Sequence, residues 1–170
     1  MRDRPRIVVV NTTPLIALTA IGKLPLFGAL YPDGVLVPDD VWLEYHAGNC
    51  GHTVADLGAI AVLRRTHLAD PRRALLLSDL DPGEAAVIAL GQERHAHLLI
   101  IDERLGRRHA KRLGFEVTGT VGVLLRAKQM GLVQRVGPML RALRTHGLYL
   151  DDAVIRGALQ AAGEGPRVES

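Results

Sequence analysis

The sequence contains a single cysteine, Cys50, which excludes a disulfide bond within the chain and suits a reducing compartment. Its longest hydrophobic runs, such as Leu98 to Ile101, fall far short of the ~18 residues that span a bilayer. Only the short apolar run from Ile7 to Val10 follows the charged N-terminus, so no signal peptide fits. We therefore expect a cytoplasmic protein with no membrane association.

Aromatic residues are also scarce, at 4% of the 170 residues, so base stacking of the kind used by single-strand-binding proteins is not indicated. The rest of the composition is ordinary for a globular protein, with 48% hydrophobic and 23% charged residues. The formal net charge of +3 is compatible with a nucleic-acid partner but does not require one. We predict one α/β domain over residues 1–163 and a frayed C-terminal tail over 164–170.

Apolar, β-branched runs alternate with helical patterns along the chain, which is typical of a parallel sheet with crossover helices. We expect strands at 7–10, 35–37, 98–101 and 116–118. The expected helices begin near residues 12, 39 and 82, and span 103–113, 121–130, 134–146 and 151–162. The pattern is weak between residues 47 and 75, where 59–63 fits either a short strand or a buried helical turn.

Four oxygen-bearing side chains are expected at one edge of this sheet. Asn11 and Asp102 each follow a buried strand, and ligands gather at the carboxyl ends of parallel strands where the strand order reverses. Glu84 lies in the first turn of the helix leading to the Asp102 strand, and Glu44 lies in an earlier helix. Because Mg²⁺ binds oxygen ligands, this pattern predicts a metal site that can activate water and stabilise charge on a phosphate.

Helix capping is an alternative interpretation of the same residues. Asn11 and Asp102 lie where a side chain can cap a helix, and Asp81, Pro82 and Glu84 form the start of a capping box. Residue types and spacing alone therefore leave capping and metal binding both open.

Four segments together carry a resemblance to a known family. They are Val-Val-Asn-Thr-Thr-Pro-Leu-Ile-Ala-Leu at 9–18, Asp-Pro-Gly-Glu-Ala at 81–85, Leu-Ile-Ile-Asp-Glu at 99–103, and Val-Thr-Gly-Thr-Val-Gly-Val-Leu-Leu-Arg-Ala-Lys at 117–128. The ordered set resembles the PIN-like domain superfamily, and within it a prokaryotic branch formerly of unknown function. The resemblance covers roughly residues 6–162, with 47–75 matching poorly.

The resemblance implies a three-layer α/β/α fold with a mostly parallel sheet, dependence on Mg²⁺ or Mn²⁺, and cleavage of RNA. It also implies a toxin ribonuclease restrained by an antitoxin protein, and a homodimer. Carried over by position, the catalytic residues are Asn11, Glu44, Glu84 and Asp102, and all except Glu44 are metal ligands. Asn11 departs from the usual aspartate of the family. Thr12 and Thr13 match supporting hydroxyl residues, although capping the first helix explains them equally well.

The helix that begins beside Asp102 carries basic residues three or four positions apart, and this spacing places Arg104, Arg107 or Arg108, and Lys111 on one face. A cationic face next to a metal site can bind RNA phosphates, and a solvated helix face is the alternative. The candidate RNA-binding residues are Arg104, Arg107, Arg108 and Lys111.

Other functions fit the sequence less well. His46, Cys50 and His52 lack a fourth ligand at the usual spacing, so we do not predict a zinc site. No GxGxxG or GxxxxGK[ST] loop follows Val10, and a receiver domain would need acidic residues where Asn11 stands. The remaining alternative to an active ribonuclease is a weakened PIN-like module that binds RNA or protein, since Asn11 replaces a charged ligand.

Overall fold

The computed structural model describes residues 4–48 and 55–166 and contains one five-stranded sheet in which every pairing is parallel. The strand order is β3-β2-β1-β4-β5. The strands are β1 (Val8–Val10), β2 (Val35–Pro38), β3 (Leu63–Thr66), β4 (Leu98–Ile100) and β5 (Glu116–Thr118). This confirms the predicted three-layer α/β/α architecture, with a sheet that is entirely parallel.

The strand order reverses between β1 and β4. From β1 the chain adds β2 and β3 on one side, and it then returns to add β4 and β5 on the other side. β1 and β4 pair in register, with Val8 opposite Leu98 and Val10 opposite Ile100. Because such crossovers are right-handed, the connections on either side of the reversal cover opposite faces of the sheet. The carboxyl ends of β1 and β4 therefore border the crevice where ligands bind in open α/β sheets.

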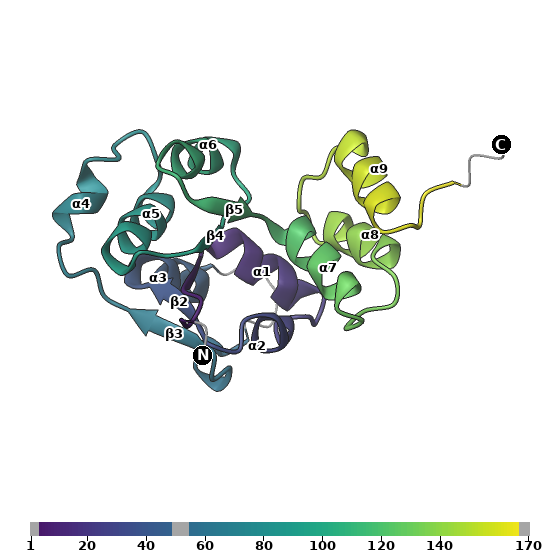
Figure 1. Cartoon of the computed structure of the whole chain (residues 1–170), viewed down its shortest axis with the longest axis horizontal. Coiled ribbons are helices and arrows are strands. Elements are labelled where there is room, and N and C mark those ends of the chain that lie inside the picture. Colours follow the sequence, from purple (N-terminus) through teal and green to yellow (C-terminus); the bar gives the residue numbers. More distant parts are fainter. Residues whose placement is uncertain (1–3, 49–54, 167–170) are drawn as a thin grey trace.

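Helices cover the sheet and extend beyond it (Figure 1). α5 packs on β1, β2 and β4, whereas α6 packs on β5, and α1 packs against α3 and α7. In Figure 1, α7, α8 and α9 gather at the end of the molecule opposite α4. The helices are α1 (Thr12–Ala20), α2 (Leu26–Leu30), α3 (Asp39–Ala47), α4 (Arg72–Leu75), α5 (Pro82–Arg94), α6 (Arg104–Arg112), α7 (Thr120–Gln129), α8 (Gly137–Thr145) and α9 (Asp152–Ala161). Within the described residues, no helix is long and apolar enough to cross a membrane.

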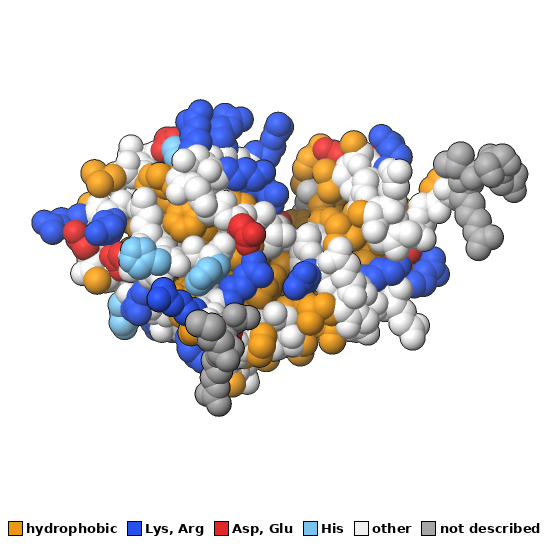
Figure 2. All heavy atoms as spheres, in the orientation of Figure 1, with side chains coloured by type: hydrophobic (Ala, Val, Ile, Leu, Met, Phe, Trp, Pro, Cys, Tyr) orange, Lys and Arg blue, Asp and Glu red, His pale blue; other side chains and the backbone are white. Residues whose placement is uncertain are grey.

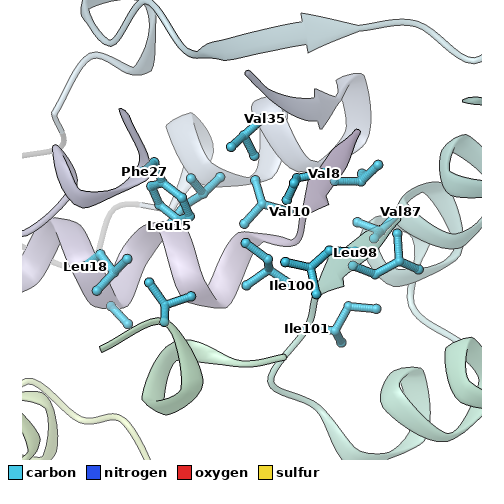
Figure 3. Packing of buried hydrophobic residues seen from close by; sticks show 14 of the residues in the cluster. Val8, Val10, Leu15, Leu18, Phe27, Val35, Val87, Leu98, Ile100 and Ile101 are labelled. Carbon is cyan, nitrogen blue, oxygen red and sulfur yellow. The ribbon is translucent and has the colours of Figure 1, made fainter. Parts of the chain in front are cut away.

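The core lies around the two central strands. Every residue of β1 is fully buried, as expected for a strand covered on both faces. Figure 3 shows Val10 of β1 and Ile100 of β4 in one cluster with Leu15, Leu18 and Phe27. This packing fixes the ends of β1 and β4, and so it fixes where Asn11 and Asp102 leave the sheet.

The weakly patterned region contains an edge strand that the sequence analysis did not locate. Residues 57–59 form a short 3₁₀ turn, and the strand begins at Leu63, at the end of the ambiguous 59–63 segment. Arg64 and Arg65 are exposed on this strand, so it lacks the apolar run that marks a buried strand. Cys50 and His52 lie outside the described residues.

The first residue of the predicted C-terminal tail is held by several hydrogen bonds. Glu164 accepts bonds from Lys128 Nζ at 2.7 Å and from the backbone N–H groups of Val136 and Gly137 at 2.6 and 2.9 Å. These bonds lower the pKa of Glu164 to about 2, although burial acts in the opposite direction. Glu164 thus joins the chain after α9 to the start of α8 and to α7.

Candidate active site

Asn11 lies directly after β1, at the point where the strand order reverses. Its backbone N–H donates to the carbonyl of Ile100 at 2.9 Å, which extends the β1–β4 pairing by one residue. The residue is only 3% exposed, and its side chain makes no capping bond to α1. Instead, Asn11 Nδ2 donates to Glu103 Oε2 at 3.2 Å. Helix capping therefore does not explain this asparagine.

Glu84 approaches the same edge from α5. The capping box predicted from the sequence is present: Glu84 N donates to Asp81 Oδ1 at 2.8 Å, and Asp81 N donates to Glu84 Oε2 at 3.4 Å. The Glu84 residue is 5% exposed, so its carboxyl has lost most of its hydration. Burial, together with the negative charges of Asp81 and Glu103, raises the pKa of Glu84 from 4.5 to about 7.

Asp102, which follows β4 by two residues, faces the start of α7. Asp102 Oδ1 accepts a bond from Thr120 N at 2.7 Å, and Oδ2 accepts one from Thr120 Oγ1 at 2.6 Å. Burial raises the pKa of Asp102, and the nearby charge of Glu103 acts in the same direction, whereas the two bonds from Thr120 lower it. Asp102 thus holds the β5–α7 junction in place, and it lies close enough to Glu103 for the two carboxylates to repel each other.

Glu44 reaches the site from α3. Thr12 Oγ1, at the start of α1, donates to Glu44 Oε2 at 2.7 Å. A Cβ atom built on Gly83 would lie 2.7 Å from that same Glu44 oxygen and 3.3 Å from Asn11 Oδ1. The first turn of α5 therefore brings Glu44 and Asn11 to the same place, and only glycine leaves room for both oxygens.

A second glycine allows α6 to approach Glu84. A Cβ on Gly106 would lie 2.7 Å from Glu84 Oε1, a contact too short for any other residue without rearrangement. The α6 backbone thus packs directly against the Glu84 carboxyl.

Glu103 is the site residue that the sequence analysis missed. Its Oε1 accepts a bond from Thr13 Oγ1 at 2.6 Å, and its Oε2 accepts the bond from Asn11. Its charge also raises the pKa of both Glu84 and Asp102. The available signal was its position, because Glu103 directly follows Asp102 at the end of a buried strand. Glu103 therefore links the residues after β1 with those on α5 and after β4.

The structure brings the predicted residues to one edge but does not join all of them directly. Asn11, Thr13 and Glu103 form one hydrogen-bonded group, whereas Thr12 and Glu44 form a second. No three histidine, cysteine, aspartate or glutamate side chains in the described ranges are grouped so that they could hold a metal ion by themselves. An amide oxygen, such as that of Asn11, lies outside that set of residue types.

Two oxygens nevertheless fit a divalent cation. Asn11 Oδ1 and Glu84 Oε1 are fully buried, and neither has a hydrogen-bond donor within the described part of the chain. Most buried polar atoms in proteins have a partner, so a pair of unsatisfied acceptors needs an explanation. Both are hard oxygen ligands close to further carboxylates, and a hard divalent cation binds such ligands.

The basic residues of α6 divide into two groups. Arg107 is partly buried and donates from Nη1 to the carbonyl of Ile101 at 3.0 Å, and its charge lowers the pKa of Asp102. Arg104, Arg108 and Lys111 are exposed. Figure 2 shows a group of basic side chains over α6. Three of the four predicted RNA-binding residues thus face solvent, whereas Arg107 faces the acidic edge.

A family model described as a PIN domain matches residues 7–164, which is nearly the whole chain. The search of curated proteins found no match to this sequence. The match includes every element of the sheet and every residue described above at its edge.

Proposed function

The chain belongs to the PIN-domain family, a nuclease-type fold, and from this premise we propose that it is a metal-dependent endoribonuclease. PIN domains are generally metal-dependent nucleases that act on nucleic acid. The finer parts of the proposal are that the substrate is RNA and that the ion is Mg²⁺ or Mn²⁺.

The observation that carries the proposal is the pair of unsatisfied buried oxygens, Asn11 Oδ1 and Glu84 Oε1. A carboxyl with a pKa near 7 is costly to ionise where it lies, and so is a second charge beside Glu103. A bound divalent cation would offset both costs, because opposite charge nearby favours the ionised carboxylate. Ionising all the carboxyls at this edge is therefore unfavourable without a cation, and a bound cation would relieve that cost.

Asn11, Glu84 and Asp102 are the residues that we propose hold the ion, and Glu44 completes the catalytic set. The chemistry that bound Mg²⁺ supplies is acidification of a water molecule and neutralisation of charge on the scissile phosphate. Glu103 fixes the amide of Asn11, so that Asn11 Oδ1 rather than Nδ2 remains available. Thr12 and Thr13 orient Glu44 and Glu103 through their hydroxyl groups.

We further propose that Arg104, Arg108 and Lys111 bind the RNA backbone beside this edge. They lie four and three residues apart on α6, which begins directly after Glu103. Exposed cations bind phosphates through counterion release and concentrate a polyanion near an otherwise acidic pocket. Arg107 acts closer to the chemistry, as a positive charge beside Asp102.

An antitoxin protein and a second copy of the chain are the partners that we propose, on the resemblance described above. A toxin ribonuclease must be inhibited in the cell that makes it, so the role predicts inhibition by a co-expressed protein. Co-purification with the product of an adjacent reading frame, followed by loss of cleavage, tests the role. Sedimentation of the purified chain alone tests the homodimer.

Cleavage of single-stranded RNA with and without Mg²⁺, followed on a sequencing gel, tests the enzymatic proposal. Glu84→Gln should lose at least 100-fold in metal-dependent rate, since a ligand charge is removed. Glu93→Gln, on the same helix but bonded to the β3–α4 loop, is the matched control and should cleave like the wild type. Equal cleavage by both variants would place the chemistry elsewhere.

One observation favours the second candidate, a PIN-like module that binds RNA without cleaving it. Asn11 contributes no charge to the site, so the ion must be held with one carboxylate fewer than in a site that begins with aspartate. In that case the protein would bind RNA at equal affinity with and without Mg²⁺ and release no product. The gel assay above, combined with filter binding, separates the two candidates.

A further inference from the structure

A small pocket lies between α1 and the end of α8, directly beside the acidic edge. Its volume is about 160 Å³. That is well below the roughly 300–1,000 Å³ of a pocket for a drug-sized molecule, so it suits one compact group. The lining residues are Thr13, Ile16, Ala17, Ala20, Leu143, His146, Gly147 and Leu148.

Thr13 belongs to both the pocket and the candidate active site. It lines the pocket, and its hydroxyl donates to Glu103, which in turn accepts a bond from Asn11. A group in the pocket is therefore separated from the buried oxygen of Asn11 by two side chains. The pocket and the proposed catalytic edge therefore meet at Thr13.

The chemistry of the surroundings identifies one kind of occupant. The pocket walls are mainly aliphatic, and a threonine hydroxyl and an imidazole are the polar groups among its lining side chains. Exposed Arg104 and Arg108, on the helix that begins after Glu103, make no hydrogen bond or ion pair within the described part of the chain. Apolar walls, together with exposed cations on a helix that begins next to Glu103, the partner of Thr13, suit a ligand with a flat apolar face attached to a phosphate backbone. A nucleotide has both features, because unstacked bases enter protein pockets while their phosphates meet basic side chains.

We infer that this pocket receives one nucleobase of the substrate strand, next to the bond that is cleaved. The inference rests on the proposed nuclease function and extends it, because such a pocket makes cleavage sensitive to one base position. The base lies against the aliphatic side chains of α1, which accounts for recognition without an aromatic platform. Ile16, at 47% exposed, forms part of the pocket's open side and becomes covered when the base enters.

An abasic scan of a short single-stranded RNA in EDTA tests this contact without requiring cleavage. For the wild type, removing the base at one position should weaken binding roughly five- to 30-fold, the effect expected when part of a base is no longer buried against aliphatic side chains. Ala20→Leu fills the pocket and should bind the intact RNA as weakly as the wild type binds that abasic RNA. In Ala20→Leu, removing the same base should then have no further effect. Ala161→Leu, on an exposed helical position of α9 away from the pocket, should reproduce the wild-type scan.

The outcomes separate this inference from the proposed function. If the wild type cleaves RNA with Mg²⁺ but no single abasic position weakens binding, the pocket holds no base and only this inference fails. An identical abasic profile for Ala20→Leu and the wild type also overturns it, and would leave the pocket to an apolar side chain of a protein partner. If the wild type neither binds nor cleaves RNA, the proposed function fails as well.

Discussion

Replacing Glu84 with glutamine should make the metal-free protein more stable while disabling the site. The pKa of Glu84 is raised from 4.5 to about 7, chiefly by burial. A group whose folded pKa lies above its unfolded value destabilises the fold as pH rises through that interval. Since one pKa unit corresponds to 1.36 kcal/mol, the penalty above pH 7 is about 3 kcal/mol at most.

Glutamine keeps the shape of Glu84 and an oxygen that can accept the bond from Asp81 N, so the capping box survives. Its buried amide N–H groups offset part of the gain, since an unsatisfied donor costs about 1–3 kcal/mol. We expect a net gain of about 1–2 kcal/mol in unfolding free energy at pH 8. The gain should shrink as pH falls toward 4.5, where the wild-type carboxyl is protonated in the folded state and about half protonated in the unfolded state.

Urea unfolding in EDTA from pH 4.5 to 8 measures this difference, with Glu116→Gln, at an exposed residue, as the control. Adding Mg²⁺ should then stabilise the wild type more than the Glu84→Gln variant, because only the wild type has the full ligand charge. A Glu84→Gln variant that is less stable than the wild type at pH 8, with a difference that does not change with pH, would refute the reasoning.

Three further outcomes follow from the structure. Glu164→Gln should lower the free energy of unfolding by about 2 kcal/mol near pH 7, because Glu164 there accepts three hydrogen bonds as a charged group. Since the pKa of Glu164 is lowered to about 2, thermal melts should show this loss shrinking as pH falls below 4.5. Arg108→Glu should weaken RNA binding, and in filter binding the slope of log affinity against log salt concentration should fall by about one. An unchanged slope would mean that Arg108 is an ordinary solvated residue that does not contact phosphate. Asn11→Asp should destabilise the metal-free protein, because a carboxylate would replace the amide whose nitrogen lies 3.2 Å from Glu103 Oε2. The same change should tighten Mg²⁺ binding in calorimetry, because it adds a charged ligand. Weaker Mg²⁺ binding would mean that Asn11 does not contact the ion.

Much of the fold could be predicted because the central elements carry strong local patterns. β1 and β4 are short apolar runs, and the start of α5 is a capping box, so their positions follow from sequence alone. β3 could not be located in the same way. It is an edge strand whose exposed Arg64 and Arg65 interrupt any apolar pattern, so pairing with β2 determines its position.

The candidate site could be predicted by position but not by contact. Spacing placed Asn11 and Asp102 at the same edge, and the strand order explains why. It could not reveal that Asp102 bonds to Thr120, 18 residues further along the chain. Nor could it reveal which of the adjacent Arg107 and Arg108, which point in different directions from the same helix, turns toward Ile101 and which stays exposed. Glu103 was not predicted as a site residue, because Asp102 alone accounted for the acidic position expected after β4.

The most direct test of the central claim is metal-dependent cleavage of total RNA by the purified protein, compared with its Asp102→Asn variant. Glu116→Gln, an exposed carboxylate at the start of β5, is the control. We predict Mg²⁺-dependent fragments from the wild type and from Glu116→Gln, and at least a 100-fold lower rate from Asp102→Asn with its fold intact by circular dichroism. Cleavage by Asp102→Asn at the wild-type rate and with the same metal dependence would contradict the claim.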